Sequence, residues 1–138
     1  MAARKSSGKA VARSRTEFLN IDLDLTGAAN LDELARALFP TLVVVHQEPG
    51  RVSLELPHQP KDADGAIVEL AGVLTRLAPE AQAIWSNCES REINIGIQAG
   101  TEPHEARFTI SRKAISLLGG LRADVIVTVY AKEGQRGG

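Results

Sequence analysis

Two aspartates near the start of the chain are the residues whose type and spacing best suit chemistry. Asp22 and Asp24 lie two positions apart in the segment 17–25, where apolar and polar residues alternate. In a β-strand such residues share one face, about 7 Å apart, so the two carboxylates would point the same way. They could hold a hard cation or act as an acid and a base. We favour the alternative that they form the wet face of a one-sided sheet, where acids also discourage pairing with a further strand.

Two more residues complete the set of candidate binding residues, which is Asp22, Asp24, Asn94 and Trp85. Asn94 falls on the polar side of a second alternating segment. Trp85 is the only tryptophan and could anchor a partner, although a core position is the more usual one for such a residue. We assign no catalytic residue.

The histidines and the cysteine show no spacing of metal ligands. His46, His58 and His104 are far apart, and no Cys-x₂-Cys or His-x₃-His motif occurs. Cys88 follows Trp85 on an apolar helical stripe, which favours a buried structural thiol over a nucleophile. We therefore expect neither a metal nor a cofactor.

Charge is unevenly distributed along the 138 residues. Residues 1–15 carry five Lys/Arg and no acid, whereas the remaining residues carry eleven Lys/Arg against seventeen Asp/Glu, a net charge of −6. The sequence predicts a disordered basic tail over 1–15, one domain over 16–132 and a disordered end over 133–138. The tail could touch nucleic acid only non-specifically. With no apolar run of about 20 residues and no secretory signal, we expect a soluble protein of the bacterial cytoplasm.

The elements that must position these residues follow from the apolar periodicity. Period two indicates strands, period 3.6 indicates helices, and Pro49-Gly50 suits the centre of a type II turn. Asn30 is expected to cap the first helix with Glu33 as its partner, and Pro79 to begin another. The expected strands are 17–25, 41–48, 51–56, 92–98, one containing Phe108 and Ile110, and 125–129; the expected helices are 30–38, 62–77, 79–88 and 111–120.

This order predicts an α+β fold with one mixed or antiparallel sheet of about six strands and three to four helices on one face. The predicted elements of residues 17–98 follow the order β-α-β-β-α-β of a ferredoxin-like core, which a further strand, helix and strand extend. The final strand, rich in Val and Ile, is expected to be buried on both faces. The uncovered face would carry polar side chains: Asn20, Asp22, Asp24, Glu92, Asn94 and Gln98.

The C-terminal third resembles a bacterial family, domain-of-unknown-function family 4279. The matching stretches are Glu92-Ile93-Asn94-Ile95-Gly96-Ile97, then Phe108-Thr109-Ile110-Ser111 before a Leu-rich helix, and finally Asp124-Val125-Ile126-Val127-Thr128-Val129-Tyr130. The family has no assigned activity, so the resemblance implies a fold and no functional residue.

Three functions stay open at this stage. The first is a non-catalytic binding module whose acidic domain recognises a basic protein, for example a toxin-neutralising immunity protein. The second is a ligand-sensing regulatory domain, dimeric through a sheet edge or a helix face. The third is a metal-dependent enzyme that uses Asp22, Asp24 and a nearby histidine.

Overall fold

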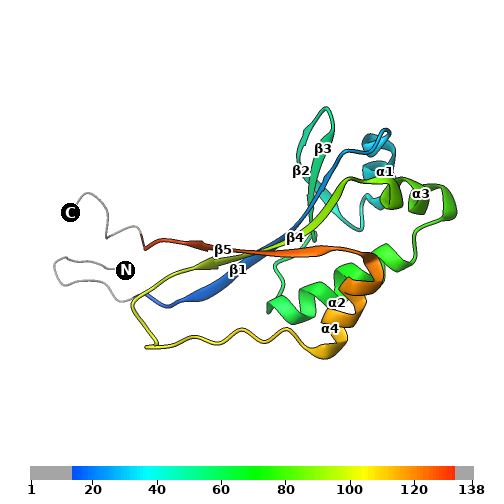
Figure 1. The fold of residues 1–138 in the computed structure, drawn as a ribbon. Helices are drawn as coiled ribbons and strands as arrows, with labels where there is room; N and C mark the ends of the chain where they lie inside the picture. The colour runs from blue at the N-terminus through cyan, green and yellow to red at the C-terminus, as the bar shows by residue number, and fades with distance from the viewer. Residues whose placement is uncertain (1–13, 133–138) are drawn as a thin grey trace.

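The computed structural model describes residues 14–132, and the termini 1–13 and 133–138 lie outside the described residues (Figure 1). Most of the expected basic tail and all of the expected C-terminal extension therefore fall beyond them. The described elements are β1 (Glu17–Thr26), α1 (Leu31–Leu38), β2 (Val43–Glu48), β3 (Arg51–Glu55), α2 (Ala63–Thr75), α3 (Pro79–Asn87), β4 (Ser90–Gln98), α4 (Arg112–Leu121) and β5 (Asp124–Tyr130).

One mixed sheet with four helices confirms the predicted α+β class within this range. The strand order is β2-β3-β1-β4-β5, in which every neighbouring pair is antiparallel except the parallel pair of β4 and β5. Helices α2 and α4 pack against each other beneath the long strands, and α1 and α3 lie together near the β2–β3 hairpin (Figure 1). The finer ferredoxin-like arrangement stays a prediction.

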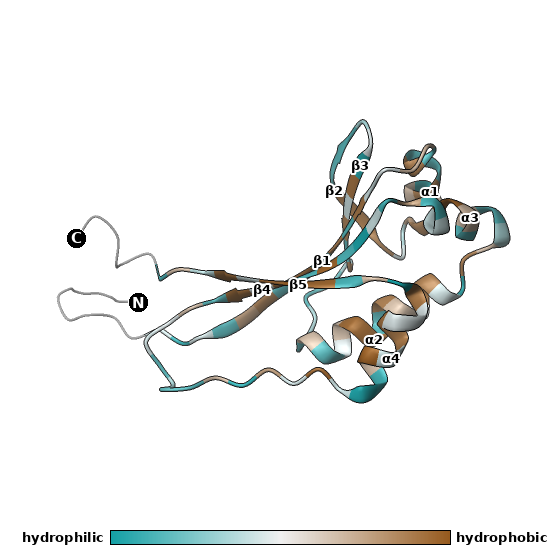
Figure 2. Ribbon diagram, in the orientation of Figure 1, coloured by the Kyte–Doolittle hydropathy of each residue, from teal (hydrophilic) through white to brown (hydrophobic). Residues whose placement is uncertain are grey.

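The core lies between the helices and one face of the sheet. Alternate residues of the central strands are fully or almost fully buried, as the periodicity predicted, and the helices add leucines and alanines (Figure 2). The sheet contributes Ile21, Leu23, Leu25, Val52, Leu54, Ile93, Ile95 and Ile97. None of the described helices is both long and apolar enough to cross a bilayer. The expected cytoplasmic location stays a prediction.

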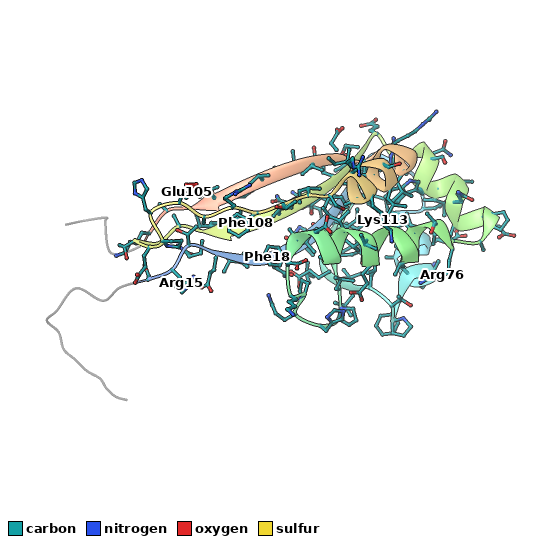
Figure 3. All side chains as sticks on the ribbon, turned by 90° about the horizontal axis from the view of Figure 1, so that it is seen from below. Arg15, Phe18, Arg76, Glu105, Phe108 and Lys113 are labelled. Carbon is teal, nitrogen blue, oxygen red and sulfur yellow. The ribbon has the colours of Figure 1, made fainter. Side chains whose placement is uncertain are left out.

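A bulge near the start of β1 breaks the predicted alternation. The register with β4 shifts between Phe18 and Asn20, so that Phe18, and not Leu19, pairs with Ile97 and packs against the core. A β-bulge adds one residue to one strand and turns the preceding side chains to the opposite face. Figure 3 shows Phe18 on the side of the sheet where the helices lie.

Among the described residues the sheet has five strands, and not the predicted six. The segment around Phe108 and Ile110 is extended but forms no strand, and it runs beneath the sheet towards α4 (Figure 1). Ile110 packs against the core while Phe108 stays 38% exposed. Because β4 and β5 are parallel, the chain must return between them along the sheet, and this segment together with α4 makes that crossover.

The prediction that β5 is buried on both faces is wrong. β5 is a border strand, and five of its seven residues are large hydrophobic side chains that are 38–60% exposed. A continuous apolar run is typical of a strand covered on both faces, but in the described range nothing covers this one.

Two helix ends also differ from the prediction. Asn30 precedes α1 with φ of 68°, a left-handed conformation that Asn tolerates, and its side chain makes no capping hydrogen bond. Gly119 and Gly120 lie inside α4, which ends at the left-handed Arg122. Ser111 caps α4, because its hydroxyl accepts the backbone N–H of Ala114 at 3.2 Å.

The last residues of the predicted tail are placed against the domain. Ser14 accepts the backbone N–H of Thr101 at 2.8 Å, and Arg15 pairs with Glu102 in an isolated parallel bridge. Gly100 permits this approach, since a Cβ there would lie 2.5 Å from the backbone of Arg15. Ser14 and Arg15 therefore contact the turn that follows β4.

Candidate functional site: the acidic face of the sheet

The face of the sheet opposite the core gathers carboxylates from four strands. The register pairs Asp22 with Glu55 on one side and with Asn94 on the other, and it pairs Asp24 with Glu92. Paired residues of neighbouring strands project to the same face. We call this surface the acidic face and define it by Asp22, Asp24, Glu55, Glu92 and Asp124.

Asp22 is the most perturbed carboxyl of this face. Burial, then a hydrogen bond to Glu55 and the negative charges of Glu55 and Asp24, raise its pKa from 3.8 to about 7. Its buried Oδ1 receives no hydrogen bond from a donor among the described residues. Asp22 therefore keeps its proton up to about pH 7, well above the range in which an aspartate usually ionises.

Asp24 and Asn94 are held by hydroxyl groups from neighbouring strands. The buried Ser53 donates its hydroxyl proton to Asp24, and Thr128 donates to Oδ1 of Asn94 at 2.9 Å. These hydrogen bonds restrict the positions of both side chains on the face.

An apolar patch borders the acidic face at its far end. Gly96 has no side chain, and the ring of Tyr130 and the Cβ of Leu19 approach within 3.6 and 3.9 Å of the place where a Cβ would lie. The bulge at Leu19 thus turns this side chain towards the open face. Together with Ile126, Leu19 and Tyr130 give the acidic face an apolar neighbour on β1 and β5.

Trp85 does not join this site. It is 5% exposed and donates its indole N–H to the carbonyl of Leu121 at 3.2 Å, which ties α3 to the end of α4. The guanidinium of Arg91 lies 6.0 Å from the ring and donates to the carbonyls of Trp85 and Cys88. Trp85 is therefore a core residue at the junction of three elements.

His58 and Cys88 are also separate from the acidic face, whereas the register places His46 opposite Ser53, at the β2 side of that face. His58 contacts Glu69 through its Nε2 at 2.7 Å, and this hydrogen bond raises the pKa of His58. Cys88 is buried, as predicted, and burial raises the pKa of its thiol. Within residues 14–132 no three His, Cys, Asp or Glu side chains are grouped as metal ligands would be.

Four pockets of the described surface lie away from the acidic face. One, of about 220 Å³, opens between α1 and the α2–α3 junction beside Arg76, and another, of about 420 Å³, lies between Phe39, Arg36 and β2. Two more lie at the hairpin turn and beside Trp85. None of these four includes a residue of the acidic face.

Sequence reasoning placed Asp22, Asp24, Glu92 and Asn94 correctly on one face but missed the residues that modulate them. Ser53 and Glu55 alternate with the buried Val52 and Leu54, and this signal was present in the sequence. What the sequence did not show is that β3 pairs with β1, which brings Glu55 against Asp22.

No family model matches the chain, and no match was found among the curated proteins or among the solved structures. The resemblance in the C-terminal third stays a prediction.

Proposed function

We propose that this chain is a non-catalytic binding module whose acidic face recognises a basic protein partner, as an immunity protein directed at a basic toxin would. The observation that carries the proposal is the concentration of five carboxylates on the helix-free face of the sheet. A single-sign surface of this kind raises the rate of encounter with a partner of opposite charge and sets the partner's orientation.

The perturbed pKa of Asp22 adds a pH dependence to this recognition. Since the carboxyl ionises near pH 7, the face gains up to one negative charge between pH 6 and 8. Affinity for a cationic partner should therefore rise over this range, and a nearby Lys or Arg would itself favour the loss of the proton.

The test is binding to a synthetic Lys/Arg-rich peptide, measured by calorimetry at low and high salt. Asp24→Asn with Glu92→Gln should weaken binding about tenfold at low ionic strength, and salt should abolish wild-type binding. The matched control, Glu33→Gln with Glu80→Gln, removes the same charge from the helices α1 and α3.

An equal loss in both double variants would show that net charge alone, and not the acidic face, attracts the peptide. Co-purification with a basic protein that survives the control substitutions and is lost with the face substitutions would then identify the natural partner.

A further inference from the structure

The outer border of β5 is the largest unpartnered feature of the described chain. No described strand pairs with it, because β5 stands at the end of the strand order; Figure 3 shows β5 along one edge of the sheet. On the helix side, Val125, Val127 and Val129 are 42, 56 and 60% exposed. In Figure 2 much of this strand is brown, the colour of hydrophobic residues. An exposed edge of this kind is a template for a further strand.

The backbone directions show which residues this border offers. The carbonyl of Tyr130 accepts the N–H of Ala99, the residue after β4, at 2.9 Å, so it points inwards. Backbone directions alternate along a strand. The N–H and C=O groups of Val125, Val127 and Val129 therefore point outwards, and they belong to the same three residues whose side chains are exposed on the helix side.

We propose that two copies of this chain associate through β5, antiparallel about a two-fold axis at Val127, to form one continuous ten-stranded sheet. In this register Val127 pairs with Val127 of the second copy, and Val125 pairs with Val129. The three outward residues would make about six backbone hydrogen bonds across the axis. Ile126 faces Thr128, and Asp124 faces Tyr130.

A second copy fits this border because β5 is self-complementary. Its outward residues read Val-x-Val-x-Val, so reversing the strand about Val127 leaves the apolar row unchanged. No pair in the proposed register sets like charges opposite each other, and β-branched residues opposite each other stabilise a sheet. The two-fold axis is perpendicular to the sheet, so both acidic faces lie on the same side of the dimer.

The first test compares lysine substitutions at the two borders of the sheet by sedimentation velocity. Val127→Lys places two ammonium groups side by side on the axis and should leave a monomer at concentrations where the wild type is a dimer. Val45→Lys is the matched control, since Val45 is 49% exposed on β2. It should leave the dimer intact, and unchanged circular dichroism shows that each variant folds.

The second test reads the register through cysteines. Facing residues of a hydrogen-bonded antiparallel pair have Cα atoms about 5.5 Å apart, within the range of a disulfide. Under mild oxidation Val127→Cys should cross-link to itself. Val125→Cys should not, because its two copies are four residues out of register, about 13 Å apart. A mixture of Val125→Cys and Val129→Cys should cross-link.

Three outcomes would overturn the proposal. They are a wild-type chain that stays monomeric up to its solubility limit, loss of the dimer with both lysine substitutions, and cross-linking of Val125→Cys alone as readily as Val127→Cys. The first would leave β5 free for a strand from a different protein; the second would place the interface elsewhere.

Discussion

The two border strands of the sheet, β2 and β5, differ in whether their outer edges can pair with a further strand. β2 carries a register shift between Val44 and His46, and its second half, His46-Gln47-Glu48, is polar. β5 is regular along its whole length with β4, and its outward residues are all valines. Bulges and charges make an edge unsuitable for pairing, so one border of this sheet is protected and the other is open.

The comparison teaches that sequence composition and exposure must be considered together. Exposed valines on β2 accompany a disrupted ladder, whereas exposed valines on β5 accompany an intact one. Only an intact ladder provides an evenly spaced row of free N–H and C=O groups, so the same residue type has different consequences at the two borders.

The largest expected effect is the loss of stability on substituting a buried residue next to each border strand. It tests whether both borders pack on the same hydrophobic core. Leu54, beside β2, and Ile95, beside β5, are 0 and 3% exposed. Substituting either by Ala leaves a cavity and should lower the free energy of unfolding by about 3 kcal/mol, measured by urea denaturation. Ile115→Ala, at a residue that is 58% exposed, should change it by less than about 0.5 kcal/mol. A cost below about 1 kcal/mol for Ile95→Ala would mean that the β5 side is loosely packed, and the contrast between the borders would then be one of packing.

The next effect concerns the attachment of the protected border. Gly27 adopts φ of 88°, its N–H donates to the carbonyl of Gly50 in the hairpin turn at 3.1 Å, and a Cβ would overlap Glu89. Gly27→Ala should therefore destabilise the fold by about 2 kcal/mol in thermal or urea unfolding. Gly119→Ala is the control, because nothing lies within 4 Å of a Cβ there and alanine favours a helix. Equal stability of the two variants would contradict the claim that position 27 requires glycine.

The smallest expected effect is a pH-dependent change in stability at Asp22, which lies on β1, the central strand between the two borders. The folded state holds this proton more tightly than the unfolded chain, so the stability it contributes is complete below pH 3.8 and is lost as the pH rises through about 7. Asp22→Asn mimics the protonated form and should stabilise the fold at pH 8 by about 1 kcal/mol, a modest gain because the carboxyl is half-exposed and solvent screens it. At pH 4 the melting temperatures of variant and wild type should coincide. The same difference at both pH values would exclude the ionisation of Asp22 as its source.

Local patterns in the sequence predicted most of the elements but not the neighbours of each strand. The alternation of Ile21 to Leu25, the Pro49-Gly50 turn and Pro79 at the start of α3 are local signals, and the structure has each of them where expected. Phe108 and Val127 depend on long-range arrangement. The same hydrophobic run suits a buried strand or an edge, and only the position of β5 outside β4 decides between them.

The candidate site shows the same division. Period two placed Asp22 and Asp24 on one face, but the raised pKa of Asp22 depends on which strand lies beside β1. A register between strands distant in sequence is set by the packing of the whole sheet, and no single segment encodes it.

The junction around Trp85 gives this chain a natural optical probe. The sequence contains one tryptophan and one tyrosine. Trp85 is enclosed where α3 meets the end of α4, while Tyr130 lies on β5 and is 52% exposed. Tryptophan emission therefore reports the opening of the interior, and tyrosine emission reports events at the border. The two signals allow loss of the core and loss of an edge contact to be followed separately in one unlabelled sample.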